Sequence, residues 1–141
     1  GSIEAAVSIP LLHIADATAA AIKQAGCSRV GLLGTKFTME QPFYRERISE
    51  LHGIEVLLPN DAERDSLHQI IYQELCLGVI TAESKQVVRK MMAGLAWQGV
   101  DGIILGCTEI GLLVGKADAA VPLFDTTVIH ANAAVEFALA E

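Results

Sequence analysis

At residues 103–110 the sequence reads Ile103-Ile104-Leu105-Gly106-Cys107-Thr108-Glu109-Ile110, a short apolar run followed at once by a cysteine and two polar residues. The β-branched run predicts a buried strand, and Gly106 marks its end. Ligands of open α/β sheets bind at the carboxyl ends of the strands. Cys107 is therefore a candidate acid, base or nucleophile. The alternative is an inert thiol in the core, because free cysteine is among the most buried residue types.

The rest of the chain alternates predicted strands with predicted helices. Helices are expected over residues 15–25, 39–52, 61–77, 81–99 and 128–140, and strands over residues 29–34, 54–58, 102–106 and 121–124, with a further short apolar run at 9–12. Such alternation with short connections is typical of a parallel sheet covered by helices on both faces. We therefore expect the α/β class, with one domain built as a three-layer sandwich around a mainly parallel sheet.

Composition excludes several classes of protein. The chain has 141 residues and a net charge of −7, without the basic surface that nucleic-acid binding requires. No apolar run approaches the roughly 18 residues that span a bilayer, and no signal peptide is apparent. The three cysteines, Cys27, Cys76 and Cys107, lack metal-ligand or redox-pair spacing. We therefore expect a cytoplasmic protein with free thiols, no metal, and neither a nucleic-acid nor a membrane partner.

Polar residues follow three of the predicted strands, at 35–38, 107–109 and 125–127. Because the carboxyl ends of parallel strands meet at one edge, these loops should be neighbours, and hydroxyls beside helix starts suit a small carboxylate. The alternative is that Thr35, Thr108 and Thr126 only cap helices. His130 is a secondary candidate, because it lies one turn into a helix that starts at this edge.

Several segments resemble the aspartate/glutamate racemase family. Residues 103–113 are similar to its second cysteine signature over all eleven positions. Further similar segments lie at residues 10–18, 31–39, 71–78 and 124–131. The resemblance covers nearly the whole chain.

The resemblance implies a cofactor-independent racemase of acidic amino acids. Such enzymes have two α/β lobes with the active site in the cleft between them. Each lobe contributes one cysteine, and the two exchange protons with opposite faces of the α-carbon. Cys107 would be the second of these cysteines. Because a free cysteine is mainly protonated at neutral pH, we expect the cleft and the adjacent helix N-termini to lower the pKa of Cys107, and an open half-site to lose part of this effect.

The resemblance assigns roles to other residues as well. Thr108, together with Thr35 and Thr38, would hold the substrate carboxylate. Glu109 is also a candidate substrate-binding residue. Related glutamate racemases have histidine at this position, so the influence of Glu109 on the thiol stays open. Cys76, a secondary candidate, lies where some relatives carry a lysine, which would alter recognition of the side-chain carboxylate.

The family's first cysteine motif does not occur in this sequence. We therefore expect residues 1–127 to form the second lobe and residues 128–141 to form a helix that packs on the first lobe. Inversion needs an acid and a base on opposite faces, so we expect negligible racemisation by this chain alone. The apolar face of the last helix predicts a homodimer; it comprises Ala131, Ala134, Val135, Ala138 and Leu139.

Two alternatives remain open at this stage. The first stays within the same superfamily: a single-cysteine decarboxylase that acts on malonates, or a racemase of other substrates. The second is a non-catalytic α/β binding or assembly module.

Overall fold

The computed structural model of the protein describes residues 14–132. In chain order the elements are a first helix over residues 14–24, β1 (Arg29–Leu33), α2 (Lys36–Glu40), α3 (Pro42–His52), β2 (Glu55–Leu57), α4 (Asp61–Gln73), the 3₁₀ turn η1 (Leu75–Leu77), α5 (Ala82–Trp97), β3 (Gly102–Leu105), α6 (Ile110–Leu113), the 3₁₀ turn η2 (Lys116–Asp118), β4 (Leu123–Asp125) and a last helix described over residues 126–132. The apolar run predicted at residues 9–12 and most of the predicted final helix lie outside this range. The apolar face expected to support a homodimer falls largely there too, so the homodimer stays a prediction.

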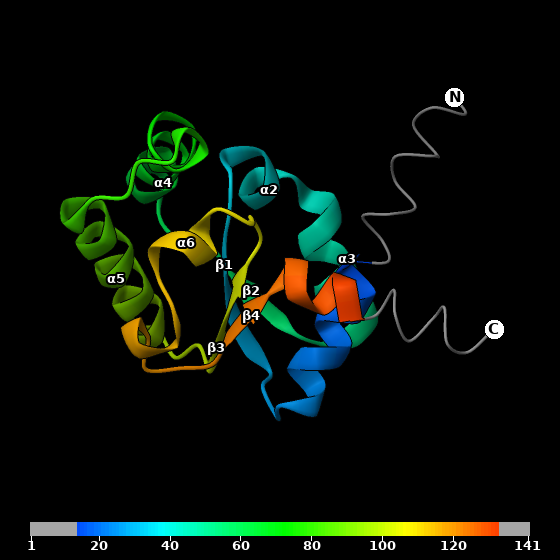
Figure 1. Cartoon of the computed structure of the whole chain (residues 1–141). Helices are drawn as coiled ribbons and strands as arrows, with labels where there is room; N and C mark the ends of the chain where they lie inside the picture. The colour runs from blue at the N-terminus through cyan, green and yellow to red at the C-terminus, as the bar shows by residue number, and fades with distance from the viewer. Residues whose placement is uncertain (1–13, 133–141) are drawn as a thin grey trace, which may run out of the picture.

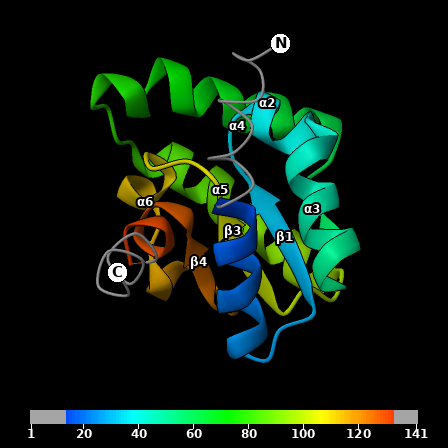
Figure 2. The ribbon, with the colours of Figure 1, turned by 90° about the vertical axis from the view of Figure 1, so that its right-hand side faces the viewer.

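The four strands form one parallel sheet in the order β2-β1-β3-β4. Figure 1 shows α5 and α6 on one face of the sheet, with α3 and the first helix on the other. In Figure 2 the first helix lies across its face of the sheet beside α3, and the last helix lies on the side of β4. The predicted α/β class and three-layer arrangement are confirmed. Within residues 14–132, no helix has the length and apolar character needed to cross a membrane.

The core forms on both sides of the two central strands. All four residues of β3 are buried, and so are the last four residues of β1. Gly31 in β1 lets α5 approach the sheet closely, because a Cβ atom there would lie only 2.7 Å from Leu95 Cδ1. Close packing of this kind leaves no room for even one added methyl group.

The predicted boundaries of four elements were wrong. The helix expected over residues 39–52 is two helices, α2 and α3, separated at Gln41, whose φ of −70° and ψ of 123° are extended. Pro42 explains the break, because proline disfavours a helical residue before it and supplies no N–H. The helix expected over 61–77 ends at Gln73 and continues only as η1. The last strand covers 123–125 instead of 121–124, and the last helix starts at residue 126 instead of 128.

One ionic cluster ties the first helix to α3. The guanidinium of Arg47 donates two hydrogen bonds of 3.0 Å to Asp16, and His52 Nε2 lies 2.9 Å from Asp16 Oδ1. The bonds from Arg47 and His52 lower the pKa of Asp16 to about 2. The cluster fixes the first helix against the face of the sheet that carries α3.

Candidate functional site

The site lies where the order of the strands reverses. From β1 the chain moves outward to β2, and it then returns past β1 to β3 and continues to β4 on the other side. The carboxyl ends of β1 and β3 are therefore neighbours at a topological switch point, which is where open α/β sheets bind ligands. The amide of Gly106 donates a 2.7 Å hydrogen bond to the carbonyl of Leu33, so the two strand exits begin in contact.

Gly106 allows the loop after β1 to close over the exit of β3. A Cβ atom on Gly106 would lie 3.1 Å from the oxygen of Leu33 and 3.3 Å from Thr38 Cγ2. Thr35 caps α2 by accepting a hydrogen bond from the Thr38 amide at 3.2 Å, and the two hydroxyl oxygens are 3.1 Å apart. The structure thus brings the Thr35–Thr38 loop beside the cysteine loop, as the parallel topology predicted.

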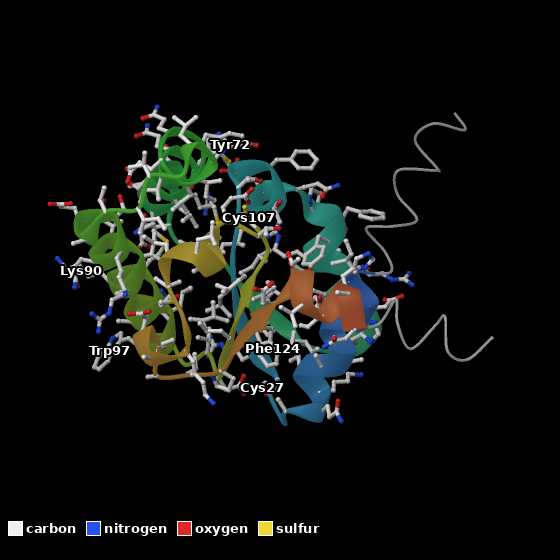
Figure 3. The ribbon with its side chains drawn as sticks, in the orientation of Figure 1. Cys27, Tyr72, Lys90, Trp97, Cys107 and Phe124 are labelled. Carbon is white, nitrogen blue, oxygen red and sulfur yellow. The ribbon has the colours of Figure 1, made fainter. Side chains whose placement is uncertain are left out.

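A cavity of about 350 Å³ opens at this edge of the sheet. It is lined by Ile14, Gly106, Cys107, Thr108, Glu109, Thr126, Thr127 and His130. Figure 3 shows Cys107 at the carboxyl end of β3, close to α2 and α6. Among the residues predicted from sequence, Thr35, Thr38 and Cys76 do not line the cavity. A second cavity of about 170 Å³, at α3 and β2, contains none of the candidate residues.

Cys107 and Glu109 form a bonded pair inside the cavity. The thiol donates to Glu109 Oε2 at 2.8 Å. Burial first, and then this bond to a carboxylate, raise the pKa of Cys107 to about 11. The bonds from the thiol and from its own backbone N–H lower the pKa of Glu109. The pKa of the thiol therefore moves opposite to the expected direction, because burial and a neighbouring negative charge both favour the protonated thiol.

The threonines at this edge have different roles. Thr35 is a helix cap, as the structural alternative predicted. Thr126 is not a cap: it is buried, and its hydroxyl donates a 3.0 Å hydrogen bond to the carbonyl of Leu105. The hydroxyls of Thr108 and Thr127 lie 2.9 Å apart on the exposed side of the cavity.

Asp125 is the residue that holds the start of the last helix. Its Oδ1 accepts hydrogen bonds from the amides of Thr127 at 2.9 Å and Val128 at 3.3 Å. Capping by an aspartate leaves the hydroxyls of the following threonines available for other partners.

The two secondary candidates occupy different positions. His130 is exposed and lines the cavity. Cys76 is exposed on η1, which packs against α6, and it makes a small contribution to the raised pKa of Cys107. Within the described part of the chain, no three His, Cys, Asp or Glu side chains are grouped so that they could hold a metal ion.

Sequence reasoning did not single out Ile14 or Thr127 as site residues, although both line the cavity. Thr127 belongs to the third polar loop, at residues 125–127, and this position could have indicated a site residue. For Ile14 the indication was weaker, because it came only from the family-like segment at residues 10–18.

Comparison with known proteins gives consistent matches. The family described as Asp/Glu/Hydantoin racemase matches residues 1–134. A solved Yersinia pestis protein assigned as an Asp/Glu racemase is 58% identical with a TM-score of 0.88, over 91% of this chain and 56% of that one. An aspartate racemase homologue from Pyrococcus horikoshii is 40% identical with a TM-score of 0.81, over 89% of this chain and 54% of that one.

A curated relative agrees with the solved structures. The glutamate racemase of Streptococcus pneumoniae is 32% identical over 114 residues, which cover 79% of this chain and 40% of the racemase. This chain therefore spans about half the length of its solved relatives, and less than half of that racemase. The resemblance found in the sequence is confirmed, and the chain belongs to the Asp/Glu/Hydantoin racemase family.

Proposed function

We propose that this chain is one lobe of an amino-acid racemase and that Cys107 is one of two groups that exchange a proton with the α-carbon of an acidic amino acid. The observation that carries the proposal is the Cys107–Glu109 hydrogen bond inside the cavity at the switch point. A protonated thiol and an ionised carboxylate in contact form an acid and a base that can pass one proton between them.

The proton balance follows from this pair. In one direction, a base on the opposite face of the substrate removes the α-proton, and the Cys107 thiol delivers its proton to the carbanion and becomes a thiolate. In the other direction, Glu109 first accepts the thiol proton, and the resulting thiolate removes the α-proton. The Thr108 hydroxyl holds the substrate carboxylate from the lining of the cavity, and the Thr35 and Thr38 hydroxyls contribute from the neighbouring loop, where Thr38 packs on Gly106. No cofactor enters either direction.

The opposing base belongs to the part of the longer relatives that this chain does not span. This chain alone should therefore exchange the α-proton with solvent but return it to the face that it left. Racemisation by this chain alone should be negligible.

The test is proton exchange in D₂O with L-aspartate and L-glutamate, followed by NMR of the α-proton and by chiral chromatography. We expect deuterium at the α-carbon with retained configuration, lost in Cys107→Ser and kept in the matched Cys76→Ser variant. Rapid racemisation by the chain alone would contradict the one-lobe proposal. Exchange that is absent, or equal in Cys107→Ser, would contradict the role of Cys107.

A second candidate is a decarboxylase that uses a single cysteine. The raised pKa of Cys107 favours it, because a protonated thiol can deliver a proton to the carbanion left when a malonate loses carbon dioxide. Incubation with a disubstituted malonate distinguishes the two. Carbon dioxide release that depends on Cys107 would favour the decarboxylase over the racemase.

A further inference from the structure

The helix that carries Thr35 and Thr38 is held in place by side chains from α4. The backbone N–H of Lys36, at the first position of α2, donates a 3.0 Å hydrogen bond to His68 Nδ1. The Lys36 ammonium pairs with Asp65 Oδ1 at 2.9 Å, one turn earlier on α4. At the other end of α2, Glu40 Oε2 lies 3.2 Å from Arg64 Nε. Both ends of α2 are thus attached to α4.

A helix as short as α2 needs such external support. It has only five residues, and isolated helices shorter than about 12 residues are marginal in water. The Lys36 amide is one of the first helical N–H groups, which have no partner inside the helix. Since Thr38 also packs on Gly106, any rotation of α2 would move its hydroxyls relative to Cys107.

The bond from Lys36 also fixes the tautomer of His68. Because Nδ1 accepts this hydrogen bond, the ring carries its proton on Nε2. The ring lies against Tyr72, with centroids 4.6 Å apart and planes at 46°. Figure 3 shows Tyr72 above the carboxyl end of the sheet, on the same side of the molecule as Cys107. Two contacts therefore orient the imidazole: the ring of Tyr72 and the backbone N–H of Lys36.

We propose that His68 is a positioning residue: by accepting the Lys36 N–H it holds the Thr35 and Thr38 hydroxyls where they bind the substrate carboxylate. The part concerning the carboxylate rests on the proposed function. The part concerning α2 stands on the hydrogen bond and the contacts of α2 alone.

Three variants separate the hydrogen bond from the ring contact. His68→Phe keeps an aromatic ring beside Tyr72 but removes the acceptor. His68→Asn places a side-chain oxygen near the position of Nδ1 and restores an acceptor without the ring. Tyr72→Leu removes the ring contact and leaves the acceptor.

The readouts are hydrogen exchange of the Lys36 amide and the NMR shift of the Thr38 amide during titration with aspartate. In His68→Phe we expect about fivefold less protection of Lys36 and an aspartate Kd about fivefold higher, as loss of one hydrogen bond predicts. His68→Asn should restore both quantities, and Tyr72→Leu should leave both nearly unchanged. A role limited to packing would give the opposite order, with Tyr72→Leu and His68→Asn as the damaging variants.

The outcomes distinguish this inference from the proposed function. If aspartate leaves Thr38 unmoved in the unsubstituted chain, the proposed function fails, and the carboxylate part of the inference fails with it. If aspartate binds the unsubstituted chain and His68→Phe equally well, only the inference is wrong. The ¹⁵N shifts of the His68 ring give a check that needs no variant, since a proton on Nδ1 would overturn the hydrogen bond itself.

Discussion

The thiol of Cys107 donates a 2.8 Å hydrogen bond to the carboxylate of Glu109, two residues further along the same loop. Burial and this bond keep the sulfur protonated at neutral pH, while the carboxylate stays ionised. In this pair, therefore, the sulfur carries the proton and is the acid, and the carboxylate is the base.

Replacing Glu109 with glutamine should make the thiol more acidic. The carboxylate opposes ionisation of the sulfur through its charge, and a neutral amide does not. Alkylation of Cys107 by iodoacetamide should show a midpoint near pH 11 in the unsubstituted chain and a lower midpoint in Glu109→Gln. Mass spectrometry of the peptide that contains Cys107 measures the rate at each pH.

The exposed Cys76 serves as the control for the alkylation experiment. Its rate in the same digest corrects for the reactivity of the reagent, and it should respond little to the Glu109 substitution. An identical midpoint for Cys107 in both proteins would show that the hydrogen bond does not control the thiol.

At low pH, protonation of Asp16 should lower the stability of the folded protein. Its pKa is lowered from 3.8 to about 2 in the folded chain, so the unfolded chain takes up a proton first as the pH falls. The stabilisation from Asp16 is therefore complete above about pH 4 and is lost as the pH approaches 2. Thermal unfolding followed by circular dichroism should show a shallower fall in Tm between pH 4 and 2 for Asp16→Asn. Parallel curves for the two proteins would contradict this account.

Substitution of Gly106 by alanine should disturb the site and the fold together. The added methyl group would lie within 3.4 Å of Leu33, Thr38 and Leu32 atoms, and overpacking of this kind costs about 1–3 kcal/mol. Gly94→Ala is the matched control, because its Cβ would meet nothing within 4 Å and a helical alanine stabilises by about 0.5–1 kcal/mol. Urea unfolding measures both, and equal stability of the two variants would refute the close contact.

Thr126 should contribute to stability more than its exposed neighbour does. Thr126→Val keeps the shape of the side chain but leaves the buried Leu105 carbonyl without this donor, which costs about 1–3 kcal/mol. Thr127→Val should change the free energy of unfolding by no more than about 0.5 kcal/mol, as is usual for surface positions. Urea unfolding of both variants gives the comparison. Equal losses would show that the Leu105 bond contributes little.

Local sequence signals predicted most of the fold. The apolar runs of β1 and β3, and the glycines after them, predicted the strands. Threonine is a preferred residue at helix N-caps, and Thr81 caps α5, where its hydroxyl accepts a hydrogen bond from the Ser84 amide at 3.0 Å. The signal for the break at Gln41 was present in Pro42, but proline is equally acceptable in the first turn of a single longer helix.

The arrangement of the site was less predictable, because it depends on contacts between distant segments. Parallel strands imply neighbouring loops, but only the strand order places Thr38 directly on Gly106. The pKa of Cys107 depends on its burial and on the rotamer of Glu109, and the short separation of the two residues in the sequence determines neither. No sequence pattern marks His68 as a functional residue, because its bond to Lys36 exists only once α2 and α4 pack together.

The pairing of β1 with β3 has a consequence for how the protein is made. Val30 pairs with Gly102, so about half of the chain is synthesised between the two partners. While it emerges from the ribosome, the growing chain can pair β1 with β2, but it exposes one edge of β1 until β3 appears. The Thr35–Thr38 loop and the loop that carries Cys107 meet only after β3 has paired with β1. The packing of Thr38 on Gly106 therefore forms in the same event that completes the central pair of strands.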